Sequence, residues 1–274
     1  MYVPHAAREG KKMPLVFDLH GSGGNGRQQA ALSDLASVAE RRGFVVADPD
    51  GGIALTDRPG AFVWHLPGLP LIGNVPEPAD APDEVQFVSD TIDQLASSSC
   101  IDASRVYVTG MSGGARMASW LACRLADRIA AVAPVAGLRA GTPLASDPTR
   151  PDPESCRPNR AMPIITFHAV HDPVNPYGGG GAGYWGYGVE AALSRWLEID
   201  RCNLEPKITR VSAHVTERRY QCAAGVEVLF YRNDAPLELG GGHVWPRSKG
   251  HSGPPEIDAS DLMWQFFDRH RVQR

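Results

Sequence analysis

A serine flanked by glycines lies at residues 110–114, in the sequence Gly-Met-Ser-Gly-Gly. The motif G-x-S-x-G follows an apolar run at 105–109 and precedes a helical pattern. At such a strand-to-helix turn, glycines avoid clashes with the flanking backbone, and the serine hydroxyl stands above the sheet at the positive end of a helix. In a glycine-rich chain these letters also occur by chance, so their position between strand and helix is what indicates Ser112 as a nucleophile.

A serine hydroxyl attacks only when a base removes its proton and an acid orients that base. Candidates for both follow two later apolar runs: Asp172 comes soon after 163–170, and His243 lies in the loop after 226–231. In α/β-hydrolases the three residues occur in the chain order Ser, Asp or Glu, His, each beyond the end of a strand. We therefore predict a catalytic triad of Ser112, Asp172 and His243.

Each triad candidate has a structural alternative. Asp172 precedes Pro173, and Asp-Pro is a common start of a turn. His243 could be an ordinary loop histidine, although the three glycines before it let the loop bend over a site. His251 is a weaker candidate in a polar loop, and we expect His171 to pack or to hydrogen-bond locally.

A second glycine-rich segment, Leu-His-Gly-Ser-Gly-Gly-Asn-Gly at residues 19–26, also lies between a predicted strand and a predicted helix. Gly21, Gly23 and Gly26 spell G-x-G-x-x-G, and Asp48 ends the next apolar run. These features match the pattern of a dinucleotide-binding loop. A dinucleotide-binding oxidoreductase is therefore one interpretation of the segment.

Lipases and esterases carry the loop of the oxyanion hole at the same place in the chain. Acyl transfer needs backbone N–H groups aimed at the negatively charged tetrahedral intermediate, and one of them belongs to the residue after the nucleophile. This interpretation also uses the triad, which a dinucleotide site leaves unexplained. We predict that the N–H groups of Ser22 and Gly113 form the oxyanion hole, and the dinucleotide site stays a remote alternative.

Apolar runs alternate with helical patterns along the whole chain, which predicts an α/β fold with a mainly parallel sheet and helices on both faces. We find no internal repeat and no linker that would divide the chain, so we expect one domain over residues 1–274. Residues 51–82 and 138–162 are predicted long ordered loops. The predicted strands are 14–20, 44–48, 105–109, 130–136, 163–170 and 226–231, and the predicted helices are 26–42, 83–97, 114–127, 188–199 and 257–270.

The composition limits the possible partners. The formal charge is −4 and the isoelectric point is near 6.1, so there is no electrostatic reason to expect nucleic acid or an anionic membrane as a partner. No uninterrupted apolar segment approaches the roughly 20 residues that a membrane-spanning helix needs. The five cysteines form no C-x-x-C pair, and their number fits both a secreted and a cytosolic protein.

With these residues identified, the chain resembles the group of α/β-hydrolases that contains extracellular polyhydroxybutyrate depolymerases, feruloyl esterases and acetylxylan esterases. The resemblance implies the α/β-hydrolase fold and the triad above. One departure is the glycine after Ser112, where many relatives have Asn or Ala, and this should be harmless because the donor is the backbone N–H. The matching segments are Pro14–Gly21, Asp102–Gly114, Ala131–Gly137, His171–Tyr177 and Gly240–Pro246.

The resemblance also implies secretion and disulfide bonds. Members of the group commonly carry signal peptides, whereas residues 1–10 contain no apolar signal region. We expect a secreted protein whose leader and first strand precede Met1, with a cytoplasmic protein as the alternative. On the pattern of the group, Cys202 pairs with Cys222, Cys123 pairs with Cys156, and Cys100 is left over.

The predicted reaction is two-step hydrolysis of an ester through an acyl-enzyme, with no metal and no organic cofactor. Aromatic residues in loops around the predicted site, Trp64, Tyr184, Trp185 and Trp245, are candidates to bind the acyl group, although we expect at least half of them to serve only loop packing. Such walls suit a feruloyl ring or a hydrophobic polyester chain equally, so the partner is a small or polymeric ester. The alternatives are an acyltransferase with the same triad and, more remotely, a non-catalytic binding protein; the sequence does not define the oligomeric state.

Overall fold

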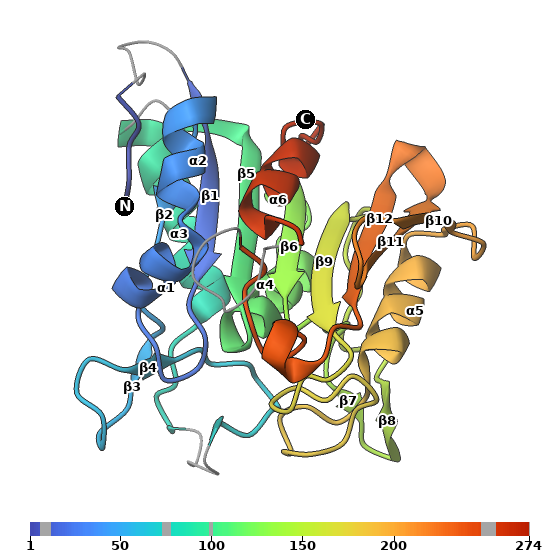
Figure 1. The fold of residues 1–274 in the computed structure, drawn as a ribbon. Helices are drawn as coiled ribbons and strands as arrows, with labels where there is room; N and C mark the ends of the chain where they lie inside the picture. The colour runs from blue at the N-terminus through green and yellow to red at the C-terminus, as the bar shows by residue number, and fades with distance from the viewer. Residues whose placement is uncertain (6–11, 73–77, 99–100, 248–255, 274) are drawn as a thin grey trace.

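One twisted sheet organises the structure, a computed structural model that describes residues 1–5, 12–72, 78–98, 101–247 and 256–273 (Figure 1). Six neighbouring strands, from β12 to β2, run parallel, and two more extend the β12 edge antiparallel. The mainly parallel sheet predicted from the sequence is thus confirmed. In spatial order, the strands are β10 (Lys207–Arg210), β11 (Val215–Gln221), β12 (Glu227–Asn233), β9 (Ile164–Ala169), β6 (Ala131–Val135), β5 (Ile101–Met111), β1 (Met13–Leu19) and β2 (Val45–Ala47).

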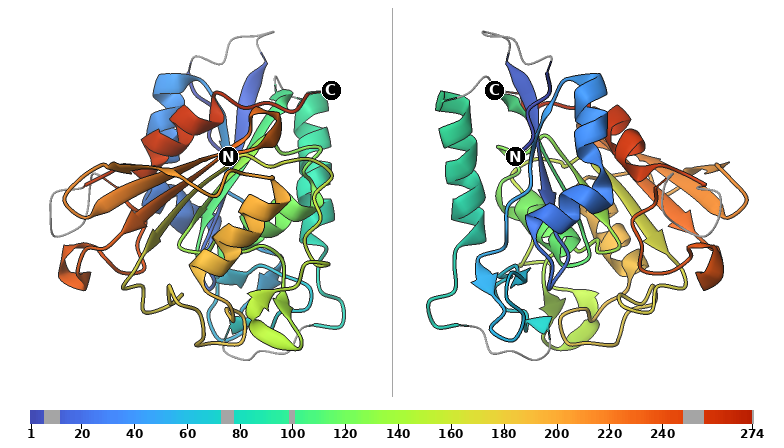
Figure 2. Two further views of the ribbon diagram at one scale, coloured as in Figure 1. Left: turned by 90° about the vertical axis from the view of Figure 1, so that its right-hand side faces the viewer. Right: turned by 60° about the vertical axis from the view of Figure 1, so that its left-hand side comes forward.

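Helices cover both faces of the sheet, and Figure 2 shows the two layers from the side. Successive side chains of a strand point to opposite faces, so Leu15 and Phe17 of β1 pack in one core cluster while Val16 packs in the other. Because both faces are covered, the central strands are continuous apolar runs. One face carries α1 (Gly26–Ser33), α2 (Leu35–Arg42) and α6 (Ala259–Phe267), and the other carries α3 (Glu84–Ser98), α4 (Gly113–Arg124) and α5 (Val189–Ile199).

The helix predicted over residues 26–42 is divided into α1 and α2 at Asp34. This residue adopts the left-handed conformation, with φ 53° and ψ 28°, which aspartate tolerates better than most side chains. Its carboxylate accepts hydrogen bonds from the Ser37 hydroxyl and from the Arg247 guanidinium. A local side-chain arrangement therefore replaces the continuous helix that the apolar pattern indicates.

The sequence pattern missed the antiparallel strands β10 and β11. All four residues of β10 are exposed, and β11 contains Glu217, Arg218 and Arg219 in succession. The Arg219 guanidinium forms ion pairs with Glu217 and with Glu227 of β12. At an exposed sheet edge, such charged pairs replace the apolar alternation by which a strand is normally recognised.

The two predicted long loops contain short hairpins. In the first, β3 (Ile53–Ala54) pairs with β4 (Phe62–Val63), and in the second, β7 (Pro143–Leu144) pairs with β8 (Asp147–Pro151). Two short 3-10 helices, η2 (Ala223–Gly225) and η3 (Leu237–Leu239), lie on either side of β12.

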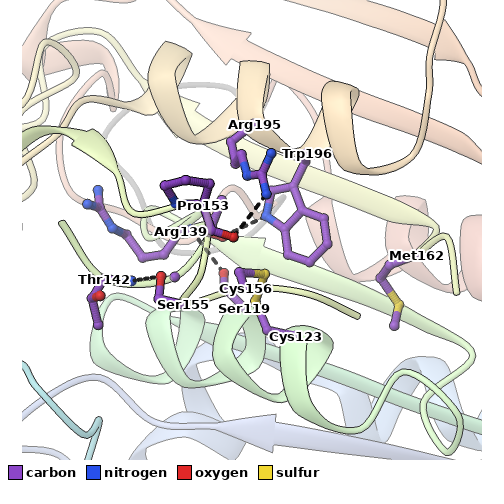
Figure 3. The surroundings of a disulfide bond; sticks show 12 residues. Ser119, Cys123, Arg139, Thr142, Pro153, Ser155, Cys156, Met162, Arg195 and Trp196 are labelled. Atoms are coloured by element: carbon purple, nitrogen blue, oxygen red, sulfur yellow. Dashed lines mark hydrogen bonds between the residues drawn. A yellow bond between two sulfur atoms is a disulfide. The ribbon is translucent and has the colours of Figure 1, made fainter. Parts of the chain in front are cut away.

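Both predicted disulfide bonds are present. Cys123, near the end of α4, is bonded to Cys156 in the segment after β8, below Trp196 of α5 (Figure 3). Cys202, just after α5, is bonded to Cys222, just after β11. Cys100, expected to be unpaired, lies outside the described residues.

Removal of the Cys123–Cys156 bond should destabilise the protein. A bond that spans 33 residues lowers the conformational entropy of the unfolded chain. In the loop-entropy model this raises the free energy of unfolding by about 3–4 kcal/mol. We expect Cys123→Ala/Cys156→Ala to lower the free energy of unfolding by about that amount, measured by urea denaturation without reductant. Under reducing conditions, the difference from wild type should vanish; equal stability of the two proteins without reductant would contradict the expectation.

Candidate active site

Ser112 lies in a strained turn between β5 and α4. Its backbone has φ 56° and ψ −111°, a conformation that costs a non-glycine residue about 1–3 kcal/mol. The turn is held because the Ser112 N–H donates to the Val135 carbonyl at 2.9 Å and its carbonyl accepts from the Arg116 N–H at 3.0 Å. This is the strand-turn-helix geometry of a nucleophile elbow, as the motif predicts.

The glycines of the motif are required by close contacts with β1 and the loop that follows it. A Cβ atom on Gly114 would lie 2.0 Å from the Leu19 carbonyl oxygen, and one on Gly110 would lie 2.6 Å from the same oxygen. A Cβ atom on Gly113 would lie 2.3 Å from Ser22 Oγ and 2.8 Å from Ser22 N. The motif therefore lets two backbone segments touch, and it brings Ser22 next to Gly113.

Asp172 and His243 are in direct contact. His243 Nδ1 lies 2.7 Å from Asp172 Oδ2, and Asp172 Oδ1 accepts the N–H groups of Val174 and Asn175, each at 2.9 Å. Asp172 is buried, and burial raises its pKa, but the hydrogen bond and charge of His243 and the Asn175 N–H outweigh it, so the net pKa is lowered. The carboxylate thus orients the histidine with one oxygen and caps its own turn with the other.

A second histidine, His168 of β9, contacts the same carboxylate and was not singled out from the sequence. Its Nε2 lies 2.9 Å from the Asn175 carbonyl oxygen and 3.5 Å from Asp172 Oδ2. Burial lowers the pKa of His168 to about 4, so the ring is neutral at neutral pH and its Nε2–H is the donor. His171, expected to pack locally, is exposed instead.

Ser112 and His243 line the same cavity, which has a volume of about 380 Å³. Leu32, Met111 and Val174 supply apolar surface, while Gln28 and Gln29 of α1 supply side-chain amides. The rest of the wall is the glycine-rich loop after β1, residues 20–24. The structure thus brings the three predicted triad residues together. Ser112 and His243 border one cavity, and Asp172 is hydrogen-bonded to His243.

The glycine-rich loop is fixed from both sides. His20 Nε2 accepts the Gly51 N–H at 2.9 Å, and its Nδ1 lies 2.8 Å from the Gly21 carbonyl oxygen. Gly23 and Gly24 form backbone hydrogen bonds with Phe62 of β4. Among the described residues, the Ser22 N–H donates to no protein group, so it is available beside the elbow.

The N-terminus of α1, where a dinucleotide pyrophosphate would bind, is already occupied by side chains of the protein. Asn25 Oδ1 accepts the Gln28 N–H at 3.0 Å, and Asp50 Oδ1 accepts the Gly26 N–H at 2.7 Å. Gly26 is also packed against the Asp48 backbone, where a Cβ atom would lie 2.0 Å from the carbonyl oxygen. A carboxylate at this point repels a phosphate, so the loop is unsuited to a dinucleotide.

Three of the four aromatic residues expected to bind substrate are packing residues. Trp64, Trp185 and Trp245 are buried, and their indole N–H groups donate to the His20 carbonyl, the Pro176 carbonyl and the Ser260 hydroxyl respectively. None of them lies on the wall of the cavity with Ser112. The expectation is corrected for these three because a position in a loop does not say whether a ring points outward; Tyr184 alone is partly exposed.

Another buried group, Asp18 of β1, was missed by the sequence analysis. Its carboxyl accepts hydrogen bonds from the Gln29 amide at 2.7 Å and from the Ser33 hydroxyl, which attaches α1 to the sheet beneath the cavity. Burial raises the pKa of Asp18 to about 8. The group is therefore largely protonated in the folded protein at neutral pH.

The strand order, the elbow after β5 and the acid and histidine beyond later strands define an α/β-hydrolase. The acetyl xylan esterase from Aspergillus awamori has the same fold, with a TM-score of 0.64 at 16% identity over 97% of this chain and 92% of that one. The model of the family "Esterase PHB depolymerase" matches residues 1–172, and the chain belongs to this family.

Two relatives extend the comparison. Feruloyl esterase B of Piromyces equi is 31% identical over 224 residues, which cover 80% of this chain and 38% of that protein. The bifunctional acetylxylan esterase/xylanase XynS20E of Neocallimastix patriciarum is 29% identical over 261 residues, 94% of this chain and 31% of that protein. The chain thus spans about a third of the length of each of these relatives.

Replacement of Gly114 tests the contact between the elbow and β1. We expect Gly114→Ala to lower the free energy of unfolding by about 2–3 kcal/mol or more, because the Leu19 carbonyl cannot move without disturbing β1. Gly178→Ala is the control, since a Cβ atom there meets nothing within 4 Å. Urea denaturation of both variants measures the effect, and equal stability would contradict the close approach.

The buried Asp18 should make stability depend on pH. Its pKa is raised from 3.8 in the unfolded chain to about 8 in the folded protein, so its stabilising contribution is full below pH 4 and is lost as the pH rises to 8. The side chain of Asp18→Asn cannot titrate. As the pH rises through this window, the free energy of unfolding of the wild type should therefore fall relative to that of the variant, by up to about 1.4 kcal/mol per pH unit. Urea denaturation from pH 5 to pH 8 compares the two; parallel pH profiles would refute the assignment.

Proposed function

We propose that residues 1–274 form a single catalytic domain that hydrolyses esters through an acyl-enzyme on Ser112. The observation that carries this proposal is the 2.7 Å contact between Asp172 and His243, with His243 and the strained Ser112 on one cavity. Asp172 keeps the histidine in the tautomer whose Nε2 is free to accept a proton, and it stabilises the imidazolium that forms.

In the first step, Ser112 Oγ attacks the ester carbonyl while His243 accepts the hydroxyl proton. The carbonyl oxygen becomes an anion, which the N–H groups of Ser22 and Gly113 stabilise. The intermediate then expels the alcohol, which takes the proton from His243. In the second step, water attacks the acyl-serine, His243 again accepts and returns the proton, and the carboxylic acid leaves.

The proposed substrates are aromatic or polymer-borne esters, because the relatives include a feruloyl esterase and an acetylxylan esterase and the matching family is described by depolymerisation of PHB. The volume of the cavity, about 380 Å³, lies in the usual range for a small-molecule site. Its apolar residues lie beside Gln28 and Gln29, so the wall can contact both an acyl chain and polar substituents. Parallel assays on methyl ferulate, acetylated xylan and polyhydroxybutyrate film would identify the acyl group.

We further propose that the protein is secreted. Two disulfide bonds are typical of proteins that mature in an oxidising compartment. Among the described helices, none is both long enough and apolar enough to cross a membrane.

Replacement of the triad residues tests the mechanism. We expect Ser112→Ala to lower kcat/KM for p-nitrophenyl acetate by at least about 10³-fold, and Asp172→Asn to lower kcat by about 10⁴-fold because the histidine tautomer is no longer fixed. The control is Ser97→Ala, an exposed serine of α3, which should retain wild-type activity. Circular dichroism and thermal unfolding would confirm that the variants fold.

A covalent probe separates the nucleophile from a residue that only supports the fold. A fluorophosphonate should add one group to the wild type and to Ser97→Ala, located by peptide mass spectrometry at Ser112, and none to Ser112→Ala. Labelling of Ser22 instead of Ser112, or full activity of Ser112→Ala, would contradict the proposed function.

A further inference from the structure

A buried arginine lies beside the proposed oxyanion hole. Arg116 is in the first turn of α4, four residues after Ser112, and its side chain is only 5% exposed. Its Nη2 donates to Ser22 Oγ at 3.0 Å. The ring of Tyr184 covers the guanidinium, with 4.3 Å between Cζ and the ring centroid. Arg116 thus contacts the residue that supplies one proposed N–H donor.

The charge of Arg116 is not balanced locally. Within the described part of the chain, no carboxylate forms an ion pair with it, and its buried Nε has no hydrogen-bond partner. Burial lowers its pKa to about 10, which leaves it cationic at neutral pH. An unpaired buried cation costs folding free energy, and an apolar side chain of similar size is usually as stable or more stable. The hydrogen bonds that the guanidinium does form must therefore show why an arginine lies at this position.

The comparison with Arg139 shows what a structural arginine looks like in the same protein. Arg139 is also buried, and its Nε, like that of Arg116, has no hydrogen-bond partner. Its guanidinium nevertheless donates to the carbonyls of Trp185 and Tyr187 and lies against both aromatic rings. Arg139 thereby links its own loop to the loop that contains Trp185 and Tyr187. Among the described residues, the side chain of Arg116 forms a hydrogen bond to Ser22 alone.

The contacts around Ser22 connect this arginine to the reaction. Ser22 N and Oγ both lie against Gly113, where a Cβ atom would be 2.8 Å and 2.3 Å from them. The hydroxyl and the N–H of one serine are three bonds apart, so a fixed hydroxyl limits the direction in which the N–H points. Arg116 does not line the cavity that contains Ser112, so it acts through Ser22 rather than on a substrate group.

We propose that Arg116 is a positioning residue of the oxyanion hole: it fixes Ser22 through its hydroxyl and adds a positive charge beside the two N–H donors. The inference rests on the proposed function. Donors that are oriented in advance stabilise the charge that develops in the transition state. A fixed cation in a site of low dielectric constant strengthens this effect without reorganisation during the reaction.

The test uses Arg116→Met, which keeps an unbranched side chain as far as the position of Nε but removes the guanidinium carbon, the charge and the donors. We expect kcat for p-nitrophenyl acetate to fall about 10- to 100-fold while KM stays within about threefold, because only the transition state carries the oxyanion. The thermal unfolding temperature should stay the same or rise. The inhibition constant of phenylboronic acid, which forms a tetrahedral anion on the serine, should rise with the loss in kcat.

Two further variants separate positioning from packing. Arg116→Lys keeps the charge and should recover part of the lost kcat. Ser22→Ala keeps the N–H but removes the hydroxyl that Arg116 holds, so Ser22→Ala/Arg116→Met should lose less than the product of the two single losses. A purely structural arginine would predict lower thermal stability, no recovery by lysine and no selective loss of boronate affinity.

Several results would overturn the inference. It is wrong if Arg116→Met keeps wild-type kcat, if the loss is confined to KM, or if lower thermal stability accompanies the loss while boronate affinity is unchanged. Ser112→Ala, measured in parallel, distinguishes failure of the proposed function from failure of the inference about Arg116. Full activity of Ser112→Ala would refute the proposed function and this inference with it, whereas inactivity of Ser112→Ala with wild-type kcat in Arg116→Met would refute only the inference.

Discussion

The structure around the cavity depends on one contact between two backbones, the approach of Leu19 and the following loop to the turn at 110–114. No side chain separates them, because a Cβ atom at Gly114 would fall 2.0 Å from the Leu19 carbonyl oxygen. The end of β1 can therefore reach the start of α4. The strained backbone of Ser112, the neighbourhood of Ser22 and Gly113 and the bond from Arg116 to Ser22 all require this approach.

Several buried ionisable groups lie around the same region. Asp172, His168, Asp18 and Arg116 are all buried, and each interacts with a segment that borders the cavity. Local rules of folding are usually broken only where function requires it, and perturbed ionisable groups gather at such sites. One of these groups, Asp172, serves the turn and the histidine at once, since its two oxygens have different partners. The two sequence interpretations of this residue were therefore compatible.

The parts predicted well from sequence were those with a local sequence signal. The central strands are recognisable because both of their faces are buried, and the Gly-Met-Ser-Gly-Gly turn is recognisable as a short motif between a strand and a helix. The contacts that require its glycines are with Leu19 and Ser22, which are distant in the sequence. The disulfide pairings followed from the resemblance to a family and not from spacing. The antiparallel strands β10 and β11 were missed because their exposed and charged residues lack the apolar alternation of a strand. Arg219 pairs with Glu217 of its own strand and with Glu227 of β12, and a single sequence does not display the second contact.

The residues that sequence reasoning missed derive their roles from distant contacts. Nothing near Asp18 in the sequence indicates that Gln29 and Ser33 will bond to it, and nothing near Arg116 indicates Ser22. The aromatic residues show the opposite error, since residues predicted to belong to the site are packing residues. Loop position suggested exposure, but Trp64, Trp185 and Trp245 each found an internal acceptor for the indole N–H, which is what a buried tryptophan requires.

The disulfide at the far end of α4 has a mechanical consequence for Ser112. The helix starts at Gly113, directly after Ser112, and Cys123 near its other end is bonded to Cys156. A helix of this length is a stiff rod of about 18 Å. The crosslink anchors the rod at the end opposite the hydroxyl. Reduction of two distant sulfur atoms would therefore remove one covalent constraint from the helix that begins directly after Ser112.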